Sequence, residues 1–497
     1  MDRFKESFPF PAAAPIAILG VPFDNVSTAE TLRIIDDMVA SKRPHYLVTA
    51  NVDFLVQAAH DVELRRILFD AHLVLCDGTP LVWASKLLGN PLPERVAGSD
   101  LVPMLLGVAA EKGYRPFFLG ASQESIEAAV ARAKHQYPKL EFAGYYSPPY
   151  NKLLEMDHEE IRERILRAQP DLLFVGFGCP KQEKWINMHY RSLGVPVSVG
   201  VGGTIDFLAG RLARAPRWMQ QSGTEWIFRL AQEPKRLLRR YAKDLWHFTG
   251  AIAAQCWQLR TTRRISRKHK PAEVRPPVPA PFQVLTLPSR LDFEEVHHLR
   301  QELESTLLSP TPVVLDLANV EFIDSTGVGL LIRLQKRARS GSNKLILANV
   351  PENVERALDL MRLNDFFIIV PDLQAAEAHL RESGKYSAVQ LRTHPASPFP
   401  ALVWNGELTA ANSEEIWIST MDHLAARSLV QRSLTIDLSK LTFIDSSGLS
   451  VMIRTRKFAT RQGMKIEFAG LHPNVLNAIR LSRLEDYLLS NAEKVSE

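Results

Sequence analysis

Short runs of consecutive apolar residues alternate with amphipathic stretches from Ile16 to about Val201. The runs HYLVTAN, LVLCDG, RPFFLGA, DLLFVGFG and VPVSVGVG predict strands, and stretches such as VDFLVQAAHDVELRRILFDA and QESIEAAVARAKHQY predict helices. Strands that alternate with helices are typical of a mostly parallel sheet with helices on both faces. The sequence therefore predicts an α/β fold, in which ligands bind beyond the carboxyl ends of the strands.

The C-terminal part of the chain contains one pattern twice. The segments VVLDLANVEFIDSTG and SLTIDLSKLTFIDSSG each predict a strand and a tight turn, and a helix, a strand and another helix follow. The second copy follows the first by 121 residues, the interval between Asp316 and Asp437. This period is too long for a solenoid unit and indicates two copies of a small α/β domain. Asp324 and Asp445 can cap the helix that follows each turn.

Two breaks in the apolar pattern divide the chain. The first, SRKHKPAEVRPPVPAPF, combines basic residues with five prolines, and the second and weaker break includes HPASPFP. We therefore expect domains at 1–265, 283–388 and 400–497, joined by linkers at 266–282 and 389–399.

Composition narrows the class of protein. The chain has 497 residues, of which 46% are hydrophobic and 23% charged, and this is typical of globular domains. The three cysteines form no CxxC pair and no His/Cys cluster, which argues against a disulfide framework and structural zinc. No apolar run approaches the ~18 residues that cross a bilayer, and the N-terminus makes a poor signal peptide. We expect a cytoplasmic protein, or one peripheral on the inner face of the cytoplasmic membrane.

Polar side chains stand where the predicted strands end. They are Thr49, Asn51, Asp77, Gln182, Glu183 and Asp206, and Arg95 follows in ERVAGSD. Each alone could be a cap or turn residue, but a parallel sheet collects strand ends along one edge, so together they indicate a binding site.

The GxGxxG, GxxxxGK[ST] and GxSxG motifs are absent, which argues against nicotinamide binding, P-loop NTPases and α/β-hydrolases. No Asp-x-Asp triplet is present to chelate a metal–diphosphate pair, so cationic side chains and backbone amides would neutralise a bound diphosphate.

An arginine-rich segment follows the predicted sheet. Pro234 is expected to open a helix that carries Arg236, Arg239 and Arg240, whose planar guanidinium groups suit phosphate oxygens. Aromatic residues then alternate with cations up to Lys268, a pattern that fits an anionic membrane surface. A solvated amphipathic helix and a nucleic-acid patch remain alternatives on this pattern alone.

Several of these motifs together resemble one enzyme family. TANVDFLVQA, DGTPLVWASKLLGNPLPERVAGSDL, GFGCPKQEKWI, VGVGGTIDFLAGRLARAPRWM and GTEWIFRLAQEPKRLLRRY occur in the order found in the WecG/TagA/CpsF glycosyltransferases. The resemblance covers about residues 16–245. It implies transfer of a sugar, commonly N-acetylmannosamine or its uronic acid, from a UDP donor to an undecaprenyl-diphosphate-linked acceptor at the membrane, with inversion and without a chelated metal or other cofactor.

The same resemblance assigns roles to residues of this chain. Asp77 matches the general base, and Arg95 is expected beside it at the catalytic centre. The residues expected to bind donor or acceptor are Thr49, Asn51, Gln182, Asp206, Arg229, Arg236 and Arg239. Nucleic acid is not an expected partner.

The two C-terminal copies resemble the STAS domain, the fold of anti-sigma-factor antagonists. The match is strongest at FIDSTG and FIDSSG, and it implies that a kinase could phosphorylate Thr326 and Ser447 and that a regulatory protein could bind around them. Two functions of different class follow. The chain could be a glycosyltransferase regulated or localised through its STAS pair, or a regulatory scaffold that binds lipid-linked sugar without turning it over.

Overall fold

The structure is a computed structural model that describes residues 11–489, except 12, 217, 220–223, 233, 267–281, 308, 310, 341–342, 365, 384–388, 394–399 and 426–432. The chain forms two compact units. The larger comprises residues 1–151 and 156–379, and the smaller comprises 152–155, with the short 3-10 helix η1 (Leu153–Glu155), and 380–497. The larger unit therefore contains both the N-terminal α/β domain and the first copy of the repeated domain.

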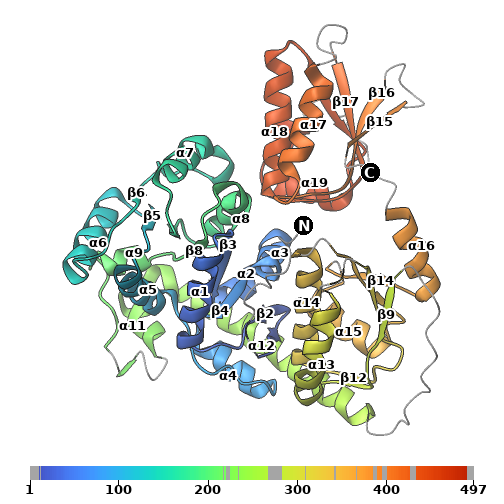
Figure 1. Ribbon diagram of the computed structural model, residues 1–497, viewed down its shortest axis with the longest axis horizontal. Helices are drawn as coiled ribbons and strands as arrows, with labels where there is room; N and C mark the ends of the chain where they lie inside the picture. Colours follow the sequence, from blue (N-terminus) through green and yellow to red (C-terminus); the bar gives the residue numbers. More distant parts are fainter. Residues whose placement is uncertain are drawn as a thin grey trace. The chain divides into compact units, whose positions relative to one another are not determined.

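A parallel sheet of six strands is the centre of the N-terminal domain (Figure 1). Its order is β4 (Leu73–Cys76), β3 (His45–Ala50), β8 (Val197–Gly200), β7 (Leu172–Gly176), β5 (Pro116–Gly120) and β6 (Gly144–Tyr146). Every residue of β3 is buried, as expected of a parallel strand that helices cover on both faces. The predicted α/β class is confirmed.

Helices connect and cover these strands. They are α1 (Thr28–Ser41), α2 (Val52–Ala58), α3 (Val62–Asp70), α4 (Thr79–Leu87), α5 (Gly98–Lys112), α6 (Gln123–Gln136), α7 (His158–Ala168), α8 (Lys181–Leu193) and α9 (Thr204–Leu208). Ile35 of α1 and Ile126 of α6 pack with Leu47, Phe118 and Phe174 of the strands in one apolar core. This core fixes the strand ends that carry the polar residues.

The amphipathic stretch over residues 52–71 is helical as predicted, and it forms two helices, α2 and α3. Asp61 starts the second helix, since its side chain accepts a hydrogen bond of 3.0 Å from the backbone N–H of Leu64. Lys184 of α8 then lies 2.8 Å from Asp61 and 2.9 Å from Glu63. These ion pairs stabilise the start of α3 at Asp61, where the apolar periodicity of the sequence shows no break.

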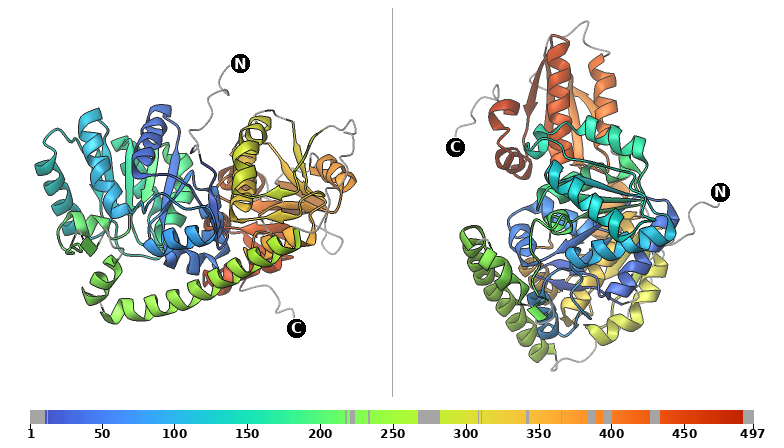
Figure 2. Two further views of the ribbon diagram at one scale, coloured as in Figure 1. Left: turned by 90° about the horizontal axis from the view of Figure 1, so that it is seen from below. Right: turned by 90° about the vertical axis from the view of Figure 1, so that its left-hand side faces the viewer.

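The basic segment forms α11 (Glu225–Gln232) and α12 (Pro234–Ser266). Figure 2 shows α12 as one long, continuous helix. It contacts α2 in the N-terminal domain, and it also contacts β12 and α15 of the first repeated domain. One helix therefore spans both parts of the larger unit.

The first repeated domain has a parallel sheet in the order β14 (Ile368–Val370), β13 (Leu345–Ala348), β11 (Val313–Asp316) and β9 (Gln283–Thr286). β10 (Arg290–Leu291) pairs separately with β12 (Phe322–Ile323), and the helices are α13 (Phe293–Thr306), α14 (Ser325–Ser340), α15 (Glu352–Leu360) and α16 (Leu373–Ser383). Asp324 accepts hydrogen bonds from the N–H groups of Thr326 (2.7 Å) and Gly327 (3.0 Å), so the expected cap of α14 is confirmed.

Helix α14 packs on the hairpin of β1 (Ile16–Ile18) and β2 (Val21–Phe23), which precedes the large sheet. The backbone approach is close, because a Cβ on Gly329 would lie 2.4 Å from the carbonyl oxygen of Pro15. Arg333 of α14 donates to the carbonyls of Pro11 (2.6 Å) and Ala13 (2.8 Å). The first repeated domain thus shares a core with the N-terminal domain.

The second repeated domain forms a sheet in the order β15 (Val389–Thr393), β16 (Pro400–Leu408), β17 (Ser433–Ile444) and β18 (Lys465–Ala469). Its helices are α17 (Ser413–Ala425), α18 (Ser446–Arg461), α19 (Pro473–Leu481) and α20 (Glu485–Leu489). Asp445 caps α18 by accepting from Gly448 N–H at 2.9 Å. Residues 389–393, which we expected in a linker, form an antiparallel edge strand because they pair with β16.

Candidate functional site

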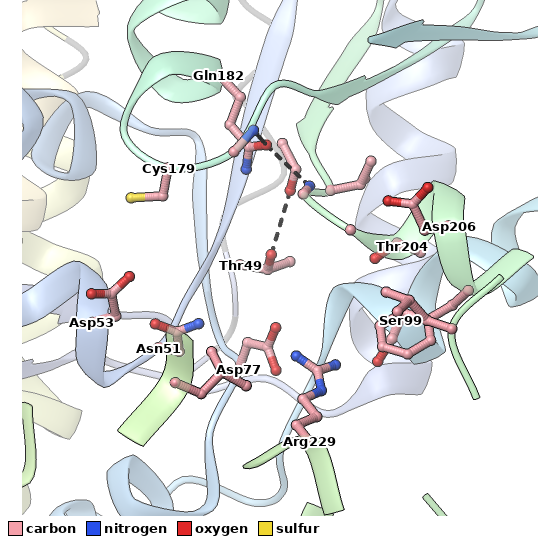
Figure 3. A pocket seen from close by; sticks show the side chains of 18 of the residues that line it. Thr49, Asn51, Asp53, Asp77, Ser99, Cys179, Gln182, Thr204, Asp206 and Arg229 are labelled. Atoms are coloured by element: carbon pink, nitrogen blue, oxygen red, sulfur yellow. Dashed lines mark hydrogen bonds between the residues drawn. The ribbon is translucent and has the colours of Figure 1, made fainter. Parts of the chain in front are cut away.

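A polar pocket of about 550 Å³ lies at the carboxyl ends of β3, β4, β7 and β8 (Figure 3). Thr49, Asn51, Asp77, Gln182 and Asp206 all line it, so the structure brings together five of the six strand-end residues that the sequence singled out, and Glu183 is not among the lining residues. Thr49 lies in β3, Asn51 caps α2, and Asp77 directly follows β4. We call this cavity the polar pocket.

Gln182 connects two glycine turns of the polar pocket through hydrogen bonds. Its Oε1 atom accepts hydrogen bonds from the N–H groups of Gly178 and Gly202, both at 3.0 Å, and both glycines have positive φ angles. Its Nε2 atom donates to Glu183 at 2.7 Å, and burial raises the pKa of Glu183 to about 7. These two glycine amides therefore point at Gln182 and not at a ligand, so Gln182 positions the turns. The expectation that backbone amides help to neutralise a bound diphosphate therefore does not extend to these two amides.

Asp77 has the electrostatic setting of a general base. Its backbone N–H donates to the carbonyl of Ala50 at 2.8 Å, which fixes the residue against β3. Burial raises the pKa of the Asp77 carboxyl to about 6, and the positive charges of Arg95 and Arg229 oppose this rise. The carboxylate is thus ionised at neutral pH, yet its proton affinity is well above that of an exposed aspartate.

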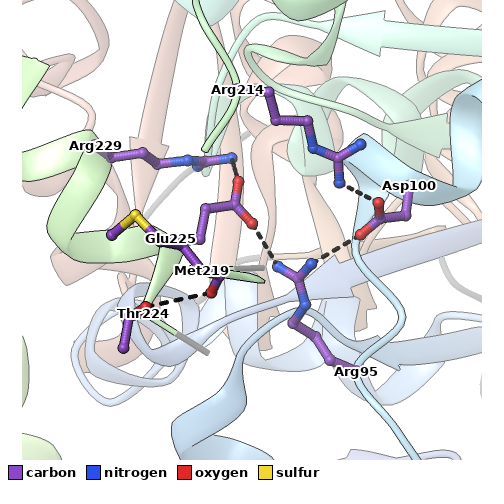
Figure 4. Close-up of polar contacts among 7 residues, drawn as sticks. All are labelled: Arg95, Asp100, Arg214, Met219, Thr224, Glu225 and Arg229. Atoms are coloured by element: carbon purple, nitrogen blue, oxygen red, sulfur yellow. Dashed lines mark hydrogen bonds and ion pairs between the residues drawn. The ribbon is translucent and has the colours of Figure 1, made fainter. Parts of the chain in front are cut away.

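Arg95 lies in a network of ion pairs beside Asp77 (Figure 4). Its guanidinium donates to Glu225 at 3.0 Å and to Asp100 at 2.8 Å, and Arg214 also pairs with Asp100. Glu225 in turn pairs with Arg229 at 3.3 Å. Because Glu225 starts α11, Arg95 ties the basic segment to the sheet edge. Glu225 and Arg214 were not predicted as site residues, although both belong to motifs that carried the family resemblance.

The arginines of the basic segment differ in position. Arg229 lines the polar pocket, with its guanidinium 4.9 Å from the ring centroid of Phe207. Arg240 also lines the pocket and lies 3.9 Å from Asp53, whereas the exposed Arg239 is not among the lining residues. The side chain of Arg236 lies outside the described residues. The sequence pattern named Arg240 as a candidate for phosphate binding, although the family resemblance assigned a role to Arg239 instead, and sequence reasoning missed Asp53 as a site residue.

A second cavity, of about 700 Å³, opens between α4 and α12. Apolar side chains dominate its walls, namely Trp83, Ala84, Leu87, Leu245, Phe248 and Ile252, and we call it the apolar groove. Asn51, Asp53, Asp77, Arg229, Arg240 and Tyr241 line both cavities. The groove therefore adjoins the polar pocket at Asp77.

The hydroxyl groups predicted as phosphorylation sites are buried. Thr326 is 0% exposed and Ser447 is 5% exposed. Within the part of the chain that the structure describes, neither hydroxyl has a hydrogen-bond partner. Phosphorylation stays a prediction, and it would require the start of α14 or α18 to become accessible.

No helix among the described residues combines the length and the apolar character needed to cross a membrane. No group of three or more His, Cys, Asp or Glu side chains among them is arranged to hold a metal ion.

Comparisons with known proteins match both parts of the chain. The family described as "Glycosyl transferase WecG/TagA/CpsF family" matches residues 16–262, and the STAS domain matches residues 270–376 and 393–496.

Individual relatives match the N-terminal part. An "N-acetylglucosaminyldiphosphoundecaprenol N-acetyl-beta-D-mannosaminyltransferase" of Staphylococcus aureus (strain MW2) is 33% identical over 228 residues, which cover 46% of this chain and 88% of that protein. A protein of the same description from Bacillus spizizenii is 37% identical over 194 residues, which cover 39% of this chain and 74% of that protein. A solved structure titled "The overall structure of SLC26A9" aligns with a TM-score of 0.18 and 13% identity over 33% of this chain and 32% of that chain, and this likeness carries no argument.

Proposed function

Because the chain belongs to the WecG/TagA/CpsF glycosyltransferase family and also carries STAS domains, we propose that it glycosylates a polyprenyl-diphosphate-linked sugar and is regulated by its STAS pair. The donor is a UDP-sugar, with N-acetylmannosamine or its uronic acid as the transferred group. The relatives' descriptions name an undecaprenyl-diphosphate-linked acceptor and N-acetylmannosamine as the transferred sugar. The single observation that carries the proposal is Asp77, an ionised, poorly solvated carboxylate at the junction of the polar pocket and the apolar groove.

The reaction is a single displacement at the anomeric carbon. An acceptor hydroxyl attacks this carbon and forms the new C–O bond, while its proton passes to the Asp77 carboxylate. The bond from the anomeric carbon to the phosphate oxygen breaks, and UDP leaves with the bonding electrons. Attack from the face opposite the leaving group inverts the anomeric configuration. Deprotonation by Asp77 raises the nucleophilicity of the hydroxyl in the transition state.

The leaving diphosphate needs positive charge near the polar pocket. Arg229 and Arg240 line the pocket and can supply it. Arg229 is held by Glu225, which Arg95 holds in turn, so a fixed network orients this cation before the reaction. Fixed cations stabilise developing charge without the reorganisation that water would require.

Two features of α12 support a position at the membrane surface. Trp246 and Trp257 are exposed on this helix, and basic side chains occur along it. Exposed tryptophans among cations fit the interfacial region of an anionic leaflet. We place the enzyme on the inner, cytoplasmic face of the membrane.

The first STAS domain is positioned to act on the transferase through α12. Gln255 of α12 donates to Ser325 at the start of α14 (2.9 Å) and to the carbonyl of Ala17 (3.0 Å), and it accepts from the N–H of Leu19 (3.0 Å). The same helix lines both cavities with Arg240 and Tyr241. A change at the start of α14 would therefore reach the site through one rigid element.

A direct assay tests the transferase proposal. The full chain is incubated with individual UDP-sugars and a prenyl-diphosphate-linked N-acetylglucosamine, and both UDP release and the product mass are measured. We expect one N-acetylmannosamine-type donor to give a glycosylated lipid product whose new linkage is inverted by NMR. Binding of the acceptor without turnover of any donor would instead support the regulatory scaffold.

A further inference from the structure

We propose that the apolar groove between α4 and α12 binds the first isoprene units of the acceptor and thereby sets the register of its sugar at Asp77. This inference rests on the proposed function, and it concerns a surface to which the comparisons assign no ligand. Its evidence is the chemistry of the groove walls, their connection to Asp77 and the charges at that connection.

The walls of the groove carry large apolar side chains, some of them exposed and others buried. Trp83 and Leu87 of α4 are 55% and 68% exposed, and Leu245 of α12 is 59% exposed. Phe248 and Ile252, one turn and two turns further along α12, are buried at 5% and 7%. The spacing of Leu245, Phe248 and Ile252 places them on one face of the helix. A contiguous apolar surface of this kind marks a binding site for an apolar ligand.

The groove and the polar pocket are adjacent, because they share six lining residues, Asp77 among them. A ligand that fills the groove therefore has one end beside the proposed base. Its volume of about 700 Å³ is in the range of ligand pockets and leaves room for part of a long chain only. The distal part of the lipid would remain outside, in the membrane.

From the apolar groove to Asp77, the lining side chains change from apolar to positively charged, which matches the order of isoprenoid, diphosphate and sugar in a lipid-linked sugar. Arg229 and Arg240 line the groove where it meets the polar pocket, and Arg95 also lines the groove. An isoprenoid in the apolar part would bring its diphosphate to these guanidinium groups, which form strong charge-assisted hydrogen bonds with phosphate. The sugar beyond the diphosphate would then reach Asp77. A bulk phospholipid has a glycerol and a single phosphodiester after its acyl chains, and a helix of another protein has no phosphate, so neither offers a diphosphate followed by a sugar.

Carboxylates also line the groove, and they do not contradict this order. Glu225 is paired with Arg95 and Arg229. Asp244 is buried, and desolvation raises the pKa of its carboxyl to about 6, with the charge of Asp53 adding to the rise. Arg240 opposes the rise in the pKa of Asp244 and lies 3.9 Å from Asp53.

The first test compares two acceptors with the same sugar diphosphate, one that carries a long prenyl chain and one that carries a methyl group in place of the prenyl chain. In the full chain, Leu87→Gln and Leu245→Gln are expected to raise the KM for the prenyl acceptor about tenfold and to leave kinetics with the methyl acceptor near those of wild type. Leu238→Gln is the matched control, because Leu238 is an equally exposed leucine of α12 that lines neither cavity. Equal losses with both acceptors, or an equal effect of Leu238→Gln, would overturn the proposal while the transferase function stands.

The second test does not depend on turnover. A prenyl diphosphate with a photoreactive group in its first isoprene units is crosslinked to the full chain, and the modified peptides are identified by mass spectrometry. We expect labels on residues 79–87 and 245–256, reduced in the Leu87→Gln and Leu245→Gln variants. Labels elsewhere, or equal labelling of these peptides by a photoreactive phospholipid, would contradict specific isoprenoid binding even if the chain proves catalytically silent.

Discussion

Gln255 lies 2.9 Å from the hydroxyl of Ser325, and this hydrogen bond joins the helix that walls the apolar groove to the capping turn of the first STAS domain. Both side chains are buried, at 1% and 0% exposure. The bond spans 70 residues of sequence and the whole basic linker region. We propose that this contact couples the STAS domain to the transferase site, and several predictions follow from this proposal and from the site itself.

Replacement of Gln255 by leucine should weaken both the domain contact and acceptor binding. The change leaves the N–H of Leu19 and the carbonyl of Ala17 without their side-chain partner, so we expect the free energy of unfolding to fall by about 2–3 kcal/mol. Looser packing of α12 should raise the KM for the lipid acceptor severalfold and change the KM for the UDP-sugar less. Thermal unfolding and steady-state kinetics measure the two effects.

A double-mutant cycle with Ser325→Ala isolates the contact between the two domains. We expect a coupling energy of at least ~0.5 kcal/mol between Gln255 and Ser325. Additive effects on stability, together with a wild-type KM for the acceptor in a folded Gln255→Leu variant, would show that α12 does not transmit the state of the STAS domain.

Arg240 and the adjacent Arg239 form a matched pair for the role of the basic segment. Arg240 lines both cavities, whereas Arg239 lines neither. We expect Arg240→Gln to lower kcat/KM at least tenfold, because a cation near the diphosphates is lost, and Arg239→Gln to lower it much less. An equal effect of the two substitutions in the same assay would indicate a general membrane-charge role for the segment.

The charge of Arg95 should set the acid limb of the pH–rate profile. Asp77 must be ionised to accept a proton, so kcat/KM should fall as the pH drops through its pKa of about 6. Arg95 lowers this pKa, and Arg95→Gln should therefore shift the acid limb to higher pH, by up to about one unit, in addition to lowering the maximum rate. A lower maximum with an unmoved acid limb would mean that Arg95 acts only by holding Glu225.

Asp77→Asn should stabilise the fold at neutral pH. The pKa of Asp77 is about 6 in the folded state, above the 3.8 of an unperturbed aspartate, so ionisation destabilises the folded state above pH 6. Allowing for the partial exposure of the side chain, the asparagine variant should gain about 1–2 kcal/mol in the free energy of unfolding at pH 7.5. The gain should disappear as the pH falls from 6 towards 4, where the wild-type residue becomes protonated in both states. Denaturant unfolding at several pH values checks this dependence.

Much of the polar pocket could be predicted from the sequence for a physical reason. Thr49, Asn51 and Asp77 follow or end buried strands, and a parallel sheet necessarily gathers such positions along one edge. The capping role of Asp324 was equally predictable, because the cap depends on local backbone geometry.

Other features depend on tertiary packing, which apolar periodicity does not encode. Gln182 stood at the expected edge, but its hydrogen bonds to Gly178 and Gly202 depend on how two separate turns meet. Arg239 and Arg240 are consecutive residues of α12, and their side chains point in different directions around the helix axis. Only the orientation of that helix therefore decides which one faces the pocket. The joint core of the first STAS domain and the β1–β2 hairpin involves Ala17 and Phe69, whose apolar character fits any core.

The central claim is that Asp77 is the base of a glycosyl transfer, and the rate of UDP release in the presence of both substrates tests it most directly. Asp77→Asn is compared with wild type and with Asp37→Asn, a matched change of an exposed aspartate on α1. We predict that Asp77→Asn loses at least a hundredfold in kcat while it still binds the UDP-sugar and remains folded, and that Asp37→Asn matches wild type. Wild-type turnover by a folded Asp77→Asn variant would contradict the account.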